Sequence, residues 1–155
     1  MKEPKVPPCA LVIFGASGDL TNRKLIPALH SLDCEGLLPA ELHVLGVART
    51  GFSDADFRQH LREGVEAHGR LKPKVWEGFA RRLFYMPGDY KDPDTFRQLG
   101  ERLRQWDEQA GTQGNRLFYM AVPPVLYTPI IERLDEAGLN RSDKGWTRII
   151  IEKPF

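Results

Sequence analysis

The sequence predicts an α/β protein with a doubly wound parallel sheet, and three observations indicate this fold class. Short apolar runs, typical of strands buried on both faces, alternate with segments whose apolar residues recur at helical spacing. The first apolar run stops at Gly15, where the chain must turn at once into a helix. The 155 residues contain no internal repeat and no low-complexity tract, so a single domain over residues 1–155 is expected.

Five strands are expected, each as a brief apolar or β-branched run bounded by turn residues. They cover Cys9–Phe14, Leu42–Ala48, Leu83–Met86, Leu117–Val122 and Thr147–Glu152. Helices separate these runs, so each connection is expected to be a right-handed crossover. Such connections produce a parallel sheet that is covered on both sides.

Helices are expected between the strands because apolar spacing and capping residues recur there. Their markers, in chain order, are Leu25 to Asp33 for the first, the N-cap Ser53, then Pro73, Asp92–Pro93, and Pro123–Pro124 closed by Gly138. Pro27 lies inside the first helix, where it is expected to kink the helix or remove a hydrogen bond.

The composition argues against several classes of protein. Lys plus Arg total 22 and Asp plus Glu total 21, so the chain lacks the basic excess of a nucleic-acid-binding protein. No stretch approaches the ~20 apolar residues of a membrane-spanning helix, and the first residues lack the apolar core of a signal peptide. Cys9, Cys34 and the histidines have no spacing that suits a metal site. A cytoplasmic protein without nucleic-acid, membrane or metal partners is expected.

The candidate binding loop is Gly15–Leu20, with the sequence Gly-Ala-Ser-Gly-Asp-Leu, between the first strand and the first helix. Glycine permits the tight turn, and the N–H groups at the helix start form an anion site that suits a pyrophosphate. The spacing is Gly-x-x-Gly and no third glycine follows, so a glycine turn without a ligand remains an alternative. A nucleophile elbow is disfavoured because Asp19 replaces its last glycine, and we interpret Ser17 as a hydroxyl donor to phosphate.

The end of the second strand, Ala48-Arg49-Thr50, indicates which dinucleotide binds. Enzymes that select NAD place a carboxylate there to hold the ribose 2′-hydroxyl. Arg49 instead offers a charged, planar donor for a 2′-phosphate, which favours NADP over NAD. A solvated loop arginine remains the alternative. Arg23 and Lys24 add positive charge near the same loop, or are simply solvated.

Four segments occur in the order and approximate spacing of one known family. They are Gly15–Leu29, Val47–Arg49, Asn115–Pro124 and Ile151–Phe155. Together they resemble the glucose-6-phosphate dehydrogenases, and the pairing of Gly-Ala-Ser-Gly-Asp-Leu with Glu-Lys-Pro-Phe is highly specific. The resemblance implies a Rossmann-type domain that binds NADP. It also implies oxidation of glucose 6-phosphate to 6-phosphogluconolactone in the pentose phosphate pathway.

The resemblance also implies roles for individual residues. The implied cofactor-binding residues are Gly15, Ala16, Ser17, Gly18, Asp19, Leu20, Thr21, Asn22, Arg49, Asp89, Tyr90, Tyr127 and Lys153. Asp89 and Tyr90 are implied for the adenosine side and Tyr127 for the nicotinamide end. Lys153 is implied for both substrate and cofactor. It follows the last strand, where ligands of such sheets bind, although taken alone a lysine there is more often solvated.

The resemblance further implies that the general-base histidine lies in an α+β substrate and dimerisation domain, beyond residue 155. We therefore expect no catalytic residue in this chain and little sugar-phosphate oxidation by the chain alone. The full-length protein is expected to be a homo-oligomer and this portion a monomer. The alternative is a freestanding NADP-binding sensor or regulatory module without catalysis.

Overall fold

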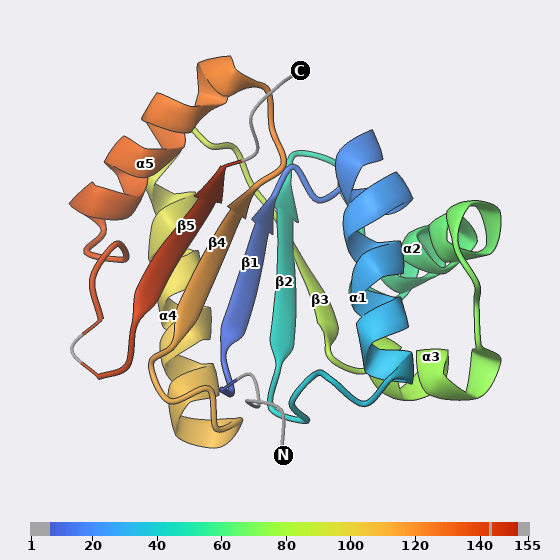
Figure 1. The fold of residues 1–155 in the computed structure, drawn as a ribbon. Helices are drawn as coiled ribbons and strands as arrows, with labels where there is room; N and C mark the ends of the chain where they lie inside the picture. The colour runs from blue at the N-terminus through green and yellow to red at the C-terminus, as the bar shows by residue number, and fades with distance from the viewer. Residues whose placement is uncertain (1–6, 143, 152–155) are drawn as a thin grey trace.

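The structure, a computed structural model, describes residues 7–142 and 144–151, and its strands and helices alternate along the chain (Figure 1). The strands are β1 (Ala10–Phe14), β2 (His43–Ala48), β3 (Leu83–Pro87), β4 (Arg116–Met120) and β5 (Thr147–Ile151). The α-helices are α1 (Ile26–Cys34), α2 (Asp54–His68), α3 (Pro73–Ala80), α4 (Pro93–Gln109) and α5 (Tyr127–Glu136). Among the described residues, no helix is both long and apolar enough to cross a membrane.

All five strands are parallel, in the order β3-β2-β1-β4-β5. Ala10 of β1 pairs with His43 on one side and with Arg116 on the other. The chain builds outward from β1 through β2 to β3, then crosses back to place β4 against the other side of β1. The predicted doubly wound α/β fold is confirmed. It creates a switch point between β1 and β4, where ligands of such sheets bind.

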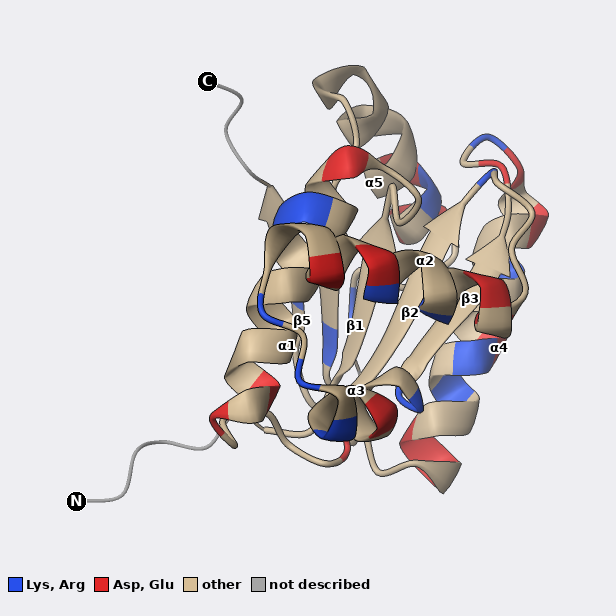
Figure 2. Ribbon diagram, turned by 90° about the vertical axis from the view of Figure 1, so that its right-hand side faces the viewer, with Lys and Arg blue, Asp and Glu red and all other residues tan. Residues whose placement is uncertain are grey.

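Two apolar layers hold the helices onto the sheet. Leu11 and Ile13 of β1 pack in the cluster that includes residues of α1, α2 and α3, whereas Val12 and Phe14 pack with residues of α4 and α5. This alternation follows from the period of two in a strand, whose successive side chains point to opposite faces. Acidic and basic residues are interspersed over the outer helices in Figure 2.

The first helix contains the irregularity expected at Pro27, in an unexpected form. Helical conformation begins at Asp19 and widens into a π-helical turn, η1 (Thr21–Leu25), just before α1. In this turn Ile26 N–H donates to the carbonyl of Thr21, five residues earlier. Pro27, the second residue of α1, directly follows this widened turn, which is one way in which a continuous helix accommodates a residue without an N–H. The helix therefore continues past Pro27 without a break.

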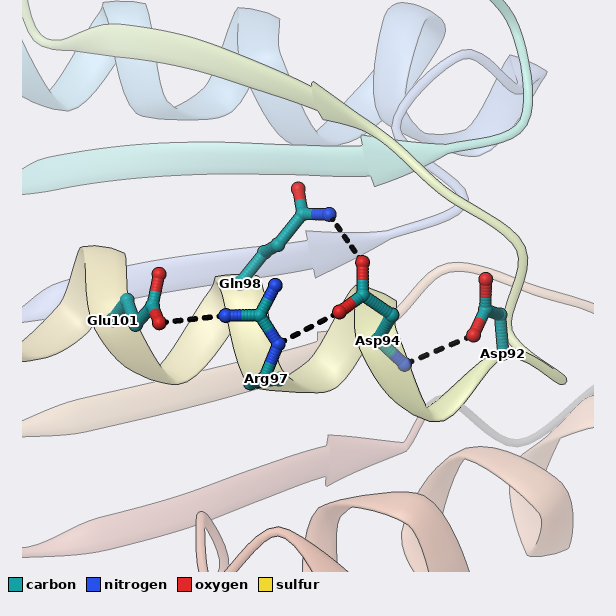
Figure 3. Close-up of polar contacts among 5 residues, drawn as sticks. All are labelled: Asp92, Asp94, Arg97, Gln98 and Glu101. Carbon is teal, nitrogen blue, oxygen red and sulfur yellow. Dashed lines mark hydrogen bonds and ion pairs between the residues drawn. The ribbon is translucent and has the colours of Figure 1, made fainter.

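The start of α4 shows how local polar contacts fix a helix boundary (Figure 3). The carboxylate of Asp92 accepts a hydrogen bond from Asp94 N–H at 2.9 Å, as an N-cap residue does. On the exposed face Arg97 donates to Asp94 and Glu101, each at 2.7 Å, and Gln98 donates to Asp94 at 2.8 Å. Arg97, and then Gln98, lower the pKa of Asp94 because they favour its charged form. The predicted N-cap at Asp92 is confirmed.

Candidate functional site

The predicted site residues that are described lie at or near the carboxyl edge of the sheet, the upper edge in Figure 1. The segments at this edge are the β1–helix loop (15–20), the end of β2 (48–50), the turn after β3 (87–90) and the end of β4 (121–123). Tyr127 follows them as the first residue of α5, after the short 3-10 turn η2 (Pro124–Leu126). Parallel strands bring these segments together although they are far apart in sequence.

Gly15 makes the turn out of β1 and lies directly against the end of β4. Its φ of +85° belongs to the left-handed region, which L side chains rarely adopt. A Cβ at this position would lie 2.0 Å from the carbonyl oxygen of Ala121. Ala121 N–H in turn donates to Phe14 O at 2.9 Å, so the contact is held by the sheet itself. Both the conformation and the space available therefore require glycine.

The loop is closed from within by its own hydrogen bonds. The carbonyl of Gly15 accepts from Gly18 N–H at 3.0 Å and from the hydroxyl of Thr21 at 3.1 Å. Thr21 is completely buried. Its hydroxyl thus shapes the loop backbone, a contact that the sequence did not predict.

The helix start supplies backbone donors next to the loop. The first hydrogen bond from an N–H to the carbonyl four residues earlier runs from Asn22 to Gly18, at 3.2 Å. The N–H groups of Asp19, Leu20 and Thr21 precede it, at the end of the helix where such groups lack a partner within the helix. Such groups, together with the helix dipole, attract an anion. The carboxylate of Asp19 opposes that attraction, and Arg23 offsets it at 4.0 Å in an exposed ion pair.

Asn22 lies in a different environment from the rest of the loop. Its Oδ1 atom is buried and accepts no hydrogen bond from the described residues. A Cβ added to Gly64 of α2 would lie 1.8 Å from this atom. The structure thus places the carbonyl end of Asn22 in the contact between η1 and α2, and a role for Asn22 in cofactor binding stays a prediction.

Tyr90 connects the loop to β2. Its hydroxyl accepts from Gly15 N–H at 2.6 Å and donates to Val47 O at 2.8 Å, while its ring meets Phe14 edge-on. Only 7% of Tyr90 is exposed. Burial raises the pKa of this phenol to about 12, against the opposing effects of the Gly15 N–H and the Arg49 charge. The hydroxyl is therefore protonated at neutral pH and can donate to Val47.

The end of β2 lies beside the loop. The Thr50 hydroxyl donates to Ser17 Oγ at 3.3 Å, which connects the two segments directly. Arg49, the preceding residue, is exposed and carries the positive charge that acts on Tyr90. Ser17 and Arg49, predicted separately from sequence, are thus brought to the same corner of the site.

The remaining predicted residues differ in what the structure says of them. Asp89 is exposed, and its carboxylate accepts from Lys91 N–H at 2.9 Å within the turn after β3. Tyr127 is half-buried at the start of α5. Lys153 lies outside the described residues.

Sequence reasoning missed Tyr85 of β3. The Tyr85 hydroxyl donates to the carbonyl of Thr50 at 2.5 Å. A tyrosine inside an otherwise apolar strand was the available signal, because a buried phenol usually has a hydrogen-bond partner.

Comparison with known proteins agrees with this geometry. Residues 12–155 match the family described as "Glucose-6-phosphate dehydrogenase, NAD binding domain". The chain belongs to the glucose-6-phosphate dehydrogenase family. The resemblance predicted from the loop and from Glu-Lys-Pro-Phe is confirmed, and the matched part of the family is described as the one that binds NAD.

Relatives and solved structures of the glucose-6-phosphate dehydrogenase family cover nearly the whole chain. The glucose-6-phosphate 1-dehydrogenases of Aggregatibacter actinomycetemcomitans and Chlamydia pneumoniae are each 44% identical, over 95% and 96% of the chain. A glucose-6-phosphate dehydrogenase solved in complex with its substrate glucose 6-phosphate matches all of the chain with a TM-score of 0.85 at 28% identity. The Mycobacterium avium enzyme matches 96% of the chain with a TM-score of 0.81 at 31% identity.

The chain is much shorter than these glucose-6-phosphate dehydrogenases. It spans 30% of the length of the two bacterial relatives and 32% and 30% of the two solved chains. All four are named as dehydrogenases, so the alternative of a freestanding sensor or regulatory module finds no support among them.

Proposed function

We propose that this chain binds NADP as the coenzyme domain of a glucose-6-phosphate dehydrogenase. The full-length enzyme then oxidises glucose 6-phosphate to 6-phosphogluconolactone. The observation that carries this proposal is the contact between Ser17 and Thr50, which joins the helix-start loop to the end of β2 beside Arg49. Two anion-attracting features, backbone N–H groups and an exposed guanidinium, thereby stand next to each other.

NADP fits this donor set because it carries two separate anionic groups. The N–H groups at the helix start suit its pyrophosphate, and Ser17 can add a hydroxyl donor. Arg49 suits the 2′-phosphate, and no carboxylate stands at positions 48–50 to bind a ribose 2′-hydroxyl or to repel that phosphate. When bound, the coenzyme accepts the hydride. The chain's part is to hold and orient it.

For the rest of the reaction, the proposal rests on the resemblance to the family. We propose that Tyr127 borders the nicotinamide end and Asp89 the adenosine side, and that Lys153 contacts both substrate and coenzyme. Oxidation of a sugar hydroxyl also needs a base to take its proton. None of the described histidines follows the carboxyl end of a strand, so we place the base in the substrate domain of the full-length enzyme. That enzyme is proposed to be a cytoplasmic homo-oligomer, and this chain a monomer.

Isothermal titration of the chain with NADP⁺ and NAD⁺ tests the proposal. We expect wild type to prefer NADP⁺ and Arg49→Ala to lose roughly 10- to 150-fold in NADP⁺ affinity, as the loss of a charge-assisted contact predicts. NAD⁺ affinity should not change. Arg62→Ala is the matched control, since Arg62 is an arginine on α2 that pairs with Glu66. Equal affinity of wild type for both coenzymes, or unchanged NADP⁺ binding in Arg49→Ala, would contradict the proposal.

A further inference from the structure

Two tyrosines contributed by β3 and the turn after it support different parts of the carboxyl edge. The Tyr90 hydroxyl bonds both Gly15 N–H and Val47 O, which also bond each other at 3.1 Å, so it supports the loop expected to meet the pyrophosphate. Tyr85 holds the carbonyl of Thr50, so it supports the turn that carries Arg49. NAD and NADP share the pyrophosphate, but only NADP has the 2′-phosphate. The Tyr90 hydroxyl therefore supports the binding of a group that both coenzymes carry, whereas the Tyr85 hydroxyl supports the binding of a group that only NADP carries.

Tyr85 is itself rigidly placed. It is 5% exposed, and its ring packs against Phe52 and Phe57 with ring centres 5.3 and 4.9 Å away. Its backbone N–H donates to the carboxylate of Asp54 at 2.8 Å, which ties this part of β3 to the start of α2. The Tyr85 hydroxyl is thus presented from a fixed position.

Thr50 has few other restraints. It is exposed, and its carbonyl accepts from the Tyr85 hydroxyl and from Phe52 N–H at 3.1 Å. Its side chain contacts Ser17. The Tyr85 bond therefore fastens the Thr50 carbonyl to the interior of the protein, next to the Phe52 ring that packs there from the same turn. A fixed backbone matters here because an arginine loses rotamer freedom when it binds, and pre-organisation lowers that cost.

We propose that Tyr85 is a positioning residue for coenzyme selection, acting through Arg49. By holding the Thr50 carbonyl it keeps Arg49 at the end of β2, where the guanidinium meets the 2′-phosphate. The inference rests on the proposed function, because it requires that NADP bind at this edge. Tyr90 supports the loop that meets the pyrophosphate of either coenzyme, so it does not change the preference for NADP over NAD.

The test compares Tyr85→Phe with Tyr90→Phe by titration with NADP⁺ and NAD⁺. Each variant keeps its ring and loses one hydroxyl. Tyr85→Phe should lower NADP⁺ affinity roughly threefold to tenfold, the range for one net hydrogen bond, and leave NAD⁺ affinity unchanged. Tyr90→Phe should weaken both coenzymes by the same factor. Because the preference is a ratio measured on one sample, partial unfolding of a variant cancels from it.

A double variant separates positioning from a general structural effect. In the Arg49→Ala background, Tyr85→Phe should cause no further loss of NADP⁺ affinity, since the side chain through which it acts is gone. An equal loss of both coenzymes in Tyr85→Phe, or the same NADP⁺ loss with and without Arg49, overturns the inference but not the proposed function. A wild-type chain that binds neither coenzyme, or both equally, overturns the proposed function and this inference with it.

Discussion

Gly15→Ala tests the contact on which the site geometry depends, the packing of the β1–helix loop against the end of β4. The φ of Gly15 is +85°, and a left-handed conformation costs an L residue roughly 1–2 kcal/mol. The added Cβ would lie 2.0 Å from Ala121 O, where ordinary van der Waals contact begins at 3.4 Å. Overpacking of this kind typically costs about 1–3 kcal/mol. The two terms predict a loss of about 2–5 kcal/mol in the free energy of unfolding.

Gly36→Ala is the matched control for this variant. Gly36 follows α1 with a φ of +71°, and an added Cβ would meet no atom within 4 Å. It therefore bears the conformational cost without the collision. The difference between the two variants isolates the contact with Ala121, which should be worth about 1–3 kcal/mol.

Urea unfolding followed by circular dichroism measures both losses, and thermal unfolding checks them. For a chain of this size each kcal/mol lowers Tm by roughly 2–4 °C, so Gly15→Ala should melt roughly 4–20 °C below wild type. Gly15→Ala should also bind NADP⁺ more weakly, because the loop must shift to admit the methyl group. If Gly15→Ala and Gly36→Ala lose the same free energy, the loop does not pack against β4 as described.

Two further predictions concern stability alone. Asp92→Ala removes the N-cap of α4 and should lower the free energy of unfolding by about 1 kcal/mol in urea titrations, whereas Asp92→Asn, which keeps a cap, should lose much less. Burial lowers the pKa of His30 below its ordinary 6.5. As the pH falls below 6.5, the unfolded chain takes up a proton on this histidine before the folded chain does. The contribution of neutral His30 to the free energy of unfolding is therefore complete above that pH and declines as the pH falls. His30→Gln should flatten the decline below about pH 6.5, and an unchanged slope would refute the assignment.

The fold was predictable because its determinants are local. Each strand is a short apolar run and each helix has apolar spacing, so neighbouring residues alone specify the element. Boundaries were less accurate: β4 begins at Arg116 and ends at Met120, where Leu117 to Val122 was expected. The π-helical turn before Pro27 was also beyond local rules. A proline predicts a lost hydrogen bond, but how the helix accommodates the loss depends on its packing.

The site was predictable only where a residue's chemistry is visible without its partner. A glycine at a strand end predicts a tight turn, and an arginine in place of a carboxylate predicts a 2′-phosphate contact, without knowledge of any other residue. Tyr90 was assigned to the adenosine side by resemblance, and its bond to Gly15 spans 75 positions. Tyr85 reaches Thr50 across 35 positions. Contacts at such separations depend on strand order, which periodicity does not specify.

The same limit explains why the loop looked deficient in glycine. In dinucleotide-binding folds, glycines serve the tight turn, the approach of the backbone to the pyrophosphate and the close packing of the first helix. Gly15 serves the tight turn, but the glycines that allow close packing lie on elements outside the loop. A Cβ on Gly46 of β2 would lie 2.7 Å from the Cβ of Ala16, and one on Gly64 of α2 would collide with Asn22. The glycines that make room for the loop and for the first helical turn thus stand on neighbouring elements, so the loop motif alone does not show all the glycines on which its packing depends.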